Sequence, residues 1–310
     1  MSVGILITYV DDLMTASTPG INALLMAKFK SIWACGEVST TLVGNVVFLS
    51  TQITKVFYKS QFGFKLDQKA YTKDLIERHR MEESSPRKTI IQPDLHETGP
   101  TLEMPERMED KLVMAEVKEA QSLAGELLWL SQRTRPDLAF AVSQAASHTT
   151  STPLRSVRIS KHILRYLVGS RDMCMFFLPP TELTPHKEWF AEKHATDPFL
   201  WSDSPNHLIA FTDASFASEG TKSFGAFVLS LGGSIVHWKC GKQSHSSYST
   251  AESELLAVAD GYVGSTSITA LVEELMPQTH MQTMLAVDNA AAVALVSQTK
   301  AVSWRTRHLE

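Results

Sequence analysis

The spacing of apolar residues predicts alternating strands and helices over residues 1–82. The runs GILITYV, TLVGNVVFLSTQIT and KSQFGFKLDQ are rich in β-branched and aromatic residues, as strands are. GINALLMAKFKSIW and KAYTKDLIERHRM instead repeat apolar residues every three or four positions, which is typical of amphipathic helices. Residues 83–111 follow, and their proline and charge content with little periodicity predicts a linker.

Residues 112–177 carry helical patterns: EVKEAQSLAGELLWLSQ, then DLAFAVSQAASHT, then PLRSVRISKHILRYLVGS. A second linker-like stretch, rich in proline, spans residues 178–207. Residues 208–310 predict three strands, a long helix from about Ser249 to Glu274, the strand MLAVDN and the helix AAAVALVSQ. The predicted fold class is therefore α/β, with a separate α/β domain after the second linker.

Composition agrees with two compact domains. The chain has 310 residues, of which 44% are hydrophobic and 20% charged, so it does not resemble a disordered protein. Neither a basic and apolar leader nor an apolar segment of membrane-spanning length is evident, and we expect a soluble, intracellular protein. Cys35, Cys174 and Cys240 are far apart and odd in number, which argues against a zinc site and against a disulfide framework.

The net charge of −4 means that a nucleic-acid partner would have to bind local basic patches. One such patch lies within residues 153–170, where basic residues recur at helical steps: Arg155, Arg158, Lys161, His162 and Arg165. Apolar residues on the same segment predict a side that faces the core: Leu154, Val157, Ile163, Leu164 and Leu167. Arg133 and Arg135 precede the patch. An ordinary solvated helix face is the alternative interpretation.

Three acidic residues of the last domain stand at predicted strand ends or at a helix start. Asp213 lies at the end of the first strand, Glu252 begins the long helix and Asp288 ends the strand MLAVDN. In an open α/β sheet such positions can meet at one edge, where oxygen ligands would hold a hard cation such as Mg²⁺. Each also has a structural alternative: Asp213 as a turn residue, Glu252 as half of a capping box with Ser249, and Asp288 as a helix N-cap.

Two adjacent acids also stand at a predicted hairpin tip, in ILITYVDDLMTAS. Asp11 and Asp12 are compatible with an ordinary tight turn between apolar strands. A preferred hairpin turn would carry glycine or asparagine, however, and adjacent like charges are unfavourable unless a cation shares them. The alternative is therefore a metal-binding hairpin.

Several separate motifs, in order along nearly the whole chain, resemble the C-terminal half of the Pol polyprotein of copia-type LTR retrotransposons. YVDD resembles the Y-x-D-D box of reverse transcriptases, and LAGELLWLSQRTRPDLAFAVS with KHILRYLVGS is similar to the stretch that leads to ribonuclease H. FTDASFAS, HWKCGKQSHSSYSTAESELLAVADG, VDNAAAVAL and RTRHLE are similar to the ribonuclease H blocks. The resemblance implies part of a polymerase palm in residues 1–82, a helical connection in 112–177 and a ribonuclease H-like domain with a mixed sheet in 208–310.

The resemblance assigns a role to each candidate residue. Tyr9, Asp11 and Asp12 match the polymerase box, and the two aspartates match its metal ligands. The acidic set of ribonuclease H is matched by Asp213, Glu252 and Asp288, with Glu310 at the place where the family usually has a fourth, aspartate ligand. The basic residues Arg133, Arg135, Arg155, Arg158, Lys161 and Arg165 would lie along the nucleic-acid duplex.

The function implied by the resemblance is hydrolysis of the RNA strand of RNA/DNA hybrids with two Mg²⁺ ions, or Mn²⁺ in their place. The partner would be such a hybrid or a template–primer duplex, in the cytoplasm within a virus-like particle or in the nucleus, and not a membrane. Contacts to the RNA 2′-hydroxyl would come from Ser215, Ser249 and Asn289, although helix capping is an equal alternative for the last two.

Departures from the family pattern limit this expectation. The third aspartate and the fingers of a polymerase are not found before YVDD, so we expect no DNA synthesis by the isolated chain. The domain 208–310 is expected to be truncated, because the family continues beyond the fourth acid. An inactive, decayed copy of a retroelement, or a protein that binds nucleic acid without cutting it, are the alternative functions.

Overall fold

The computed structural model describes residues 4–58, 61–91, 111–177, 206–217 and 222–297. The first elements are the hairpin β1 (Gly4–Tyr9) and β2 (Asp12–Ser17), followed by helix α1 (Pro19–Ile32). A second, antiparallel sheet has the order β3-β4-β5-β6. Its strands are β3 (Val46–Phe48), β4 (Thr51–Tyr58), β5 (Gln61–Asp67) and β6 (Met175–Phe177).

The run TLVGNVVFLSTQIT, predicted as one strand, forms two. Phe48 pairs with Thr51, so Leu49 and Ser50 make a two-residue turn between β3 and β4. Both turn residues have positive φ angles, 51° for Leu49 and 60° for Ser50. The twist of a tight hairpin requires such angles, although residues with a side chain disfavour them. Neither is a glycine or asparagine, so the sequence carried no turn signal. Strand β6 was also missed, because three residues are too few to show a period.

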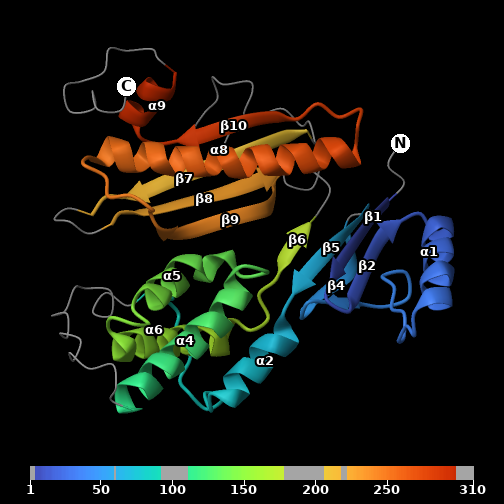
Figure 1. Ribbon diagram of the computed structural model, residues 1–310, viewed down its shortest axis with the longest axis horizontal. Helices are drawn as coiled ribbons and strands as arrows, with labels where there is room; N and C mark the ends of the chain where they lie inside the picture. The colour runs from blue at the N-terminus through green and yellow to red at the C-terminus, as the bar shows by residue number, and fades with distance from the viewer. Residues whose placement is uncertain (1–3, 59–60, 92–110, 178–205, 218–221, 298–310) are drawn as a thin grey trace.

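Helices α2 (Lys69–Arg78), α4 (Lys111–Ser131), α5 (Ala139–Ser147) and α6 (Pro153–Ser170) pack together, with a 3₁₀ turn η1 (Pro136–Leu138) before α5. Figure 1 shows α4, α5 and α6 grouped below the last sheet. Their shared core consists of leucine, isoleucine, valine and alanine side chains, among them Leu75, Leu123, Leu127, Leu138, Val142, Ile163 and Leu167. The helical patterns predicted for residues 112–170 are therefore confirmed as helices with one common core.

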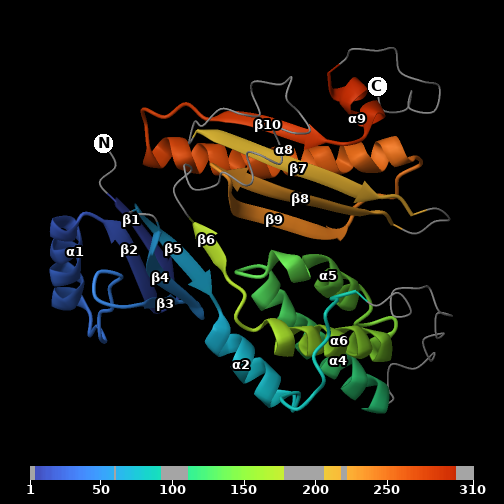
Figure 2. The ribbon, with the colours of Figure 1, turned by 180° about the vertical axis from the view of Figure 1, so that it is seen from behind.

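The last unit, here called the C-terminal unit, is a four-stranded mixed sheet covered on one face by a long helix. Its strands, in the order β10-β7-β8-β9, are β7 (His207–Ser215), β8 (Phe224–Leu231), β9 (Ser234–Lys242) and β10 (Gln282–Val287). Strand β10 is parallel to β7, whereas β8 and β9 are antiparallel to their neighbours. Helix α8 (Thr250–Leu275) lies in front of the sheet in the view of Figure 1 and behind it in Figure 2. Helix α9 (Ala290–Val296) follows β10 in the chain. The predicted α/β class is confirmed.

Small residues let α8 lie close to the sheet. A Cβ added at Gly261 would be 2.6 Å from Thr212 Cγ2, and one added at Gly264 would be 3.1 Å from the Phe227 ring. By length and composition alone α8 also meets the criteria for a membrane span, because it has 26 residues and contains an 18-residue stretch with a mean hydropathy of 1.4. The expectation that no segment has this length and hydropathy is therefore wrong, although the buried face of α8 packs on β7 and β8 as in the core of a sheet domain.

Strand β9 connects the C-terminal unit to the helices. Trp238 Nε1 donates a hydrogen bond to the Ser131 carbonyl at the end of α4, at 2.8 Å. Phe140 of α5 meets Phe224 of β8 edge to face, with ring centroids 5.7 Å apart. The indole and the aromatic pair thus join elements about a hundred positions apart in sequence.

Two helical glycines provide a matched test of the α8 packing. Gly261→Ala should lower the free energy of unfolding by about 1–3 kcal/mol, because its Cβ would overlap Thr212. Gly125→Ala in α4, where no atom lies within 4 Å of the added Cβ, should raise it by about 0.5–1 kcal/mol, because alanine is the better helix former. Urea unfolding measures both changes, and a stabilising Gly261→Ala would contradict the close contact of α8 with β7.

Candidate functional site

Parallel pairing of β7 and β10 brings two of the predicted acids together. Thr212 is paired with Val287, so Asp213 and Asp288 stand next to each other at the carboxyl ends of these strands. The third acid at this edge is Glu254 of α8, and one carboxylate oxygen from each of the three residues lies within 4.8 Å of the others. The described part of the chain contains no other cluster of three or more such groups.

Glu254, not the predicted Glu252, completes this acidic cluster of Asp213, Glu254 and Asp288 because of its position on the turns of α8. The buried residues of the helix follow Glu254 at steps of three and four: Ala257, Val258, Gly261, Gly264 and Ser265. Glu252 lies two positions earlier, about 200° around the helix, and points away from this face. The apolar and small residues after Glu254 are the sequence signal that would have identified it.

Glu252 instead stabilises the start of α8. Ser249 Oγ accepts a hydrogen bond from the Glu252 backbone N–H at 3.2 Å, and Glu252 Oε2 accepts one from the Tyr248 N–H at 2.6 Å. This is the capping-box alternative for S-T-A-E, with the glutamate reaching the residue before the N-cap. The prediction of Glu252 as a metal ligand is therefore corrected.

Asn289 and Ser249, predicted either as caps or as 2′-hydroxyl contacts, both cap helices. Asn289 Oδ1 accepts hydrogen bonds from the N–H groups of Ala291 and Ala292, each at 3.0 Å, at the start of α9. Because Asn289 serves as the N-cap, the Asp288 carboxylate remains exposed beside Asp213. Ser215 is exposed at the last position of β7, two residues beyond Asp213.

The environment of Glu254 favours its protonated form. Burial first, and then the negative charges of Asp213 and Asp288, raise the pKa of Glu254 to about 7, although a hydrogen bond from the Ala214 backbone acts in the opposite direction. The residue is only 7% exposed, and its Oε2 has no hydrogen-bond partner among the described residues. Three clustered carboxylates with a buried, unpartnered oxygen are a suitable donor set for a hard divalent cation.

The N-terminal acids lie on the predicted hairpin, which the structure confirms. Tyr9 pairs with Asp12 across a two-residue turn of Val10 and Asp11, and both aspartates are exposed. Val10 is 92% exposed and has a φ of 54°, which a β-branched side chain strongly disfavours. Neither aspartate belongs to a group of three metal-ligating side chains among the described residues.

The predicted basic helix is α6, and its charged residues differ in what they contact. Arg158 and Lys161 are exposed, with Lys161 Nζ 3.7 Å from Glu119. Arg165 donates to the Ser85 carbonyl at 3.1 Å, and the buried His162 lies 2.9 Å from the Thr89 carbonyl, so both hold residues 85–89 against the helix. Arg155 is half-buried. The predicted core residues of α6 are buried except Leu154, which is 46% exposed.

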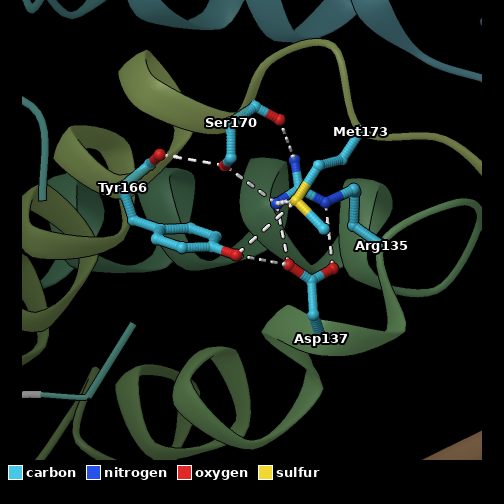
Figure 3. A network of polar contacts seen from close by, with 5 residues as sticks. All are labelled: Arg135, Asp137, Tyr166, Ser170 and Met173. Carbon is cyan, nitrogen blue, oxygen red and sulfur yellow. Dashed lines mark hydrogen bonds and ion pairs between the residues drawn. The ribbon is translucent and has the colours of Figure 1, made fainter. Parts of the chain in front are cut away.

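Arg135, predicted to contact nucleic acid, is a buried structural residue (Figure 3). Its side chain is paired bidentately with Asp137 at 2.9 and 2.8 Å, and it donates to the carbonyl and the hydroxyl of Ser170, each at 3.0 Å. Tyr166 contributes its ring, 5.6 Å from the guanidinium, and a hydroxyl that donates to Asp137. With 2% exposure, Arg135 stabilises the C-terminal end of α6 and cannot reach a phosphate.

Arg133 remains a candidate phosphate contact. It is half-buried, and its guanidinium lies 4.2 Å from the ring centroid of Trp129, one turn earlier on α4. This cation–π contact holds the side chain in one orientation without using its hydrogen-bond donors. Glu310, the predicted fourth ligand, lies outside the described residues.

Comparison with known proteins identifies the homologues of this chain as retrotransposon Pol polyproteins. The chain is 26% identical over 261 residues to the "Retrovirus-related Pol polyprotein from transposon TNT 1-94" of Nicotiana tabacum, a match that covers 83% of this chain and 17% of the relative. It is 25% identical over 235 residues to the corresponding polyprotein of transposon RE2 of Arabidopsis thaliana, covering 75% of this chain and 14% of the relative.

A third relative comes from yeast. The "Transposon Ty1-LR3 Gag-Pol polyprotein" of Saccharomyces cerevisiae is 23% identical over 192 residues, which cover 62% of this chain and 10% of the relative. The chain thus spans less than a fifth of the length of each of these curated relatives. No family model matches it. The resemblance to retrotransposon Pol polyproteins is confirmed by these relatives.

Replacement of Arg135 tests its structural role. Arg135→Gln should lower the free energy of unfolding by about 2–3 kcal/mol, because Asp137 loses its bidentate partner and the last carbonyl of α6 loses a donor. Arg158→Gln, on the exposed side of α6, should change it by less than about 0.5 kcal/mol. Chemical denaturation of the two variants measures this difference. Equal stabilities of the two variants would show that Arg135 has no structural role beyond that of an exposed cation such as Arg158.

The raised pKa of Glu254 predicts a dependence of stability on pH. A glutamate with a pKa of 4.5 when unfolded and about 7 when folded binds its proton more tightly in the folded state. Its favourable contribution is complete below pH 4.5 and is lost as the pH rises through 7. With EDTA present, Glu254→Gln should therefore stabilise the protein by about 2–3 kcal/mol at pH 8 and by much less at pH 4.5. Urea unfolding at both pH values checks this, and a difference independent of pH would refute it.

Proposed function

We propose that the C-terminal unit hydrolyses the RNA strand of RNA/DNA hybrids, within a chain homologous to part of retrotransposon Pol polyproteins. The observation that carries this proposal is the acidic cluster of Asp213, Glu254 and Asp288 at the carboxyl ends of the parallel pair β7 and β10. Ligands of open α/β sheets bind at such edges. An intracellular location, as expected from the sequence, is part of the same proposal.

The cluster would hold two Mg²⁺ ions, or Mn²⁺ in their place, through its carboxylate oxygens. Ions bound there supply an activated water and stabilise the oxygen that leaves the phosphodiester. The buried Oε2 of Glu254, which no donor of the described residues reaches, is the atom whose unfavourable position a cation would compensate. The raised pKa of Glu254 indicates that cation binding would release its proton near neutral pH.

Two features of the protein prepare the cluster before any ligand arrives. Glu254 is fixed by its burial and by the hydrogen bond from the Ala214 backbone. Asp288 is free to bind because Asn289 takes the N-cap position of α9. Such fixed positions matter because a misplaced ligand lowers the rate of a metal-assisted displacement.

Contacts to the duplex would come from the exposed cations Arg158 and Lys161 and from Arg133. Because the net charge is −4, binding would depend on these local contacts and would weaken as salt is added. Ser215, exposed beside the acidic cluster, is the remaining candidate for a contact to the 2′-hydroxyl, which distinguishes RNA from DNA. The exposed Asp11 and Asp12 receive no catalytic role in this proposal.

Cleavage of a labelled RNA/DNA hybrid with Mg²⁺ tests the proposal and the choice between the two glutamates. Asp213→Asn and Glu254→Gln should each lower the cleavage rate at least about a hundredfold, because each removes a ligand carboxylate. Glu252→Gln should retain cleavage and change the stability by less than about 0.5 kcal/mol, because a glutamine Oε1 can accept the same hydrogen bond in the cap.

Circular dichroism shows whether each variant is folded, and duplex DNA and single-stranded RNA serve as substrate controls. Cleavage that survives Glu254→Gln but not Glu252→Gln would reverse the assignment. Salt-sensitive binding of the hybrid by the folded wild type, without cleavage, would identify a non-catalytic nucleic-acid-binding protein.

A further inference from the structure

A buried amide lies next to the acidic cluster and contacts the same helix turn as Glu254. Gln243 follows the end of β9 and is 9% exposed. Its Nε2 donates a hydrogen bond of 2.7 Å to the carbonyl of Ser253, the residue that precedes Glu254 in α8. Its own backbone N–H donates to the Ser223 carbonyl at 2.8 Å, so the residue is tied to the sheet at one end and to the helix at the other.

The sheet provides a specific place for this amide. Gly225 of β8 pairs with Ala214, whose backbone hydrogen-bonds Glu254, and a Cβ added at Gly225 would lie 3.1 Å from Gln243 Nε2. The absence of a side chain at Gly225 therefore makes room for the amide between the sheet and α8. The same added Cβ would be 3.6 Å from the Ala257 Cβ, one turn beyond Glu254.

The amide also carries an energetic cost. Within the part of the chain that the structure describes, Gln243 Oε1 is buried without a hydrogen-bond partner, as is Glu254 Oε2. An unsatisfied buried acceptor destabilises the folded state, and a leucine of similar volume would avoid that cost. The hydrogen bond that Gln243 Nε2 donates to the Ser253 carbonyl is thus the feature that distinguishes glutamine from an apolar residue at this position.

We propose that Gln243 is a positioning residue for Glu254. Its hydrogen bond fixes the first turns of α8 against β8, and this fixes the distance of the Glu254 carboxylate from Asp213 and Asp288. The inference rests on the proposed function, because it assigns Gln243 a role in holding a metal ligand. Residues that orient metal ligands without touching the metal typically change metal affinity by about tenfold or more when replaced.

Thermal unfolding over a Mg²⁺ titration tests this role apart from catalysis. Mg²⁺ should raise the Tm of the wild type, and Gln243→Leu should need about tenfold more Mg²⁺ for half of that rise. The matched control is Gln68→Leu, because Gln68 is also a buried glutamine, and its Oε1 accepts from Thr134 at 3.0 Å, in a different unit. This control should lower the metal-free Tm and leave the half-saturating Mg²⁺ concentration unchanged.

An unchanged half-saturating concentration in Gln243→Leu would overturn the proposal and leave the amide a purely structural group. If Gln243→Leu does not fold, Gly225→Ala displaces the same amide from the sheet side and should raise that concentration about two- to threefold; no shift would overturn the proposal as well. A wild-type Tm that does not change with Mg²⁺ would also overturn the proposed role of Gln243. A wild type that binds Mg²⁺ but leaves the hybrid intact would overturn the proposed function alone.

Discussion

Close packing of α8 on β7 and β8 determines where the acids of the C-terminal unit meet. Gly261 and Gly264 have no side chain to separate the helix from Thr212 and Phe227, so the helix lies close to the sheet along this face. One face of α8 is therefore fixed against the sheet, and Glu254 is on that face. The strand pairing of β7 with β10 fixes the other two acids independently. The acidic cluster exists because these two constraints coincide at one end of the sheet.

This arrangement is unfavourable for the metal-free protein. Three carboxylates with oxygens within 4.8 Å repel one another, and Glu254 is buried as well. Among the described residues, Thr212, Gln243 and Glu254 each contain a buried side-chain atom without a hydrogen-bond partner; Thr212 lies on β7, Glu254 on α8, and Gln243 directly follows β9. Three further atoms of this kind, on Gln68, Ser156 and Ser160, lie away from the cluster, so what distinguishes the Glu254 oxygen is its place among three carboxylates.

Positive charge is divided between structural and exposed positions. Arg135 and Arg165 come from segments with the same basic pattern as Arg158 and Lys161, yet the first two hydrogen-bond the backbone and the last two face solvent. Arginine serves the structural positions because its planar group donates in several directions at once, as Arg135 does toward Asp137 and Ser170. Fewer cations are therefore available to a phosphate backbone than the number of basic residues in and before α6 suggests.

Periodicity and local motifs in the sequence determined the helices, most strands, the hairpin at Asp11 and Asp12, and the strand ends of Asp213 and Asp288. These features depend on residues a few positions apart, so the sequence alone predicted them. Only the tertiary structure showed that Glu254 and not Glu252 joins the acidic cluster, and that Arg135 is buried whereas Arg158 is exposed. It also showed that a turn falls at Leu49 and Ser50. Each choice depends on which side of a helix faces a distant strand, or on a backbone conformation that the chain adopts against local preference. Contacts between residues far apart in sequence set these orientations, and spacing along the chain does not record them.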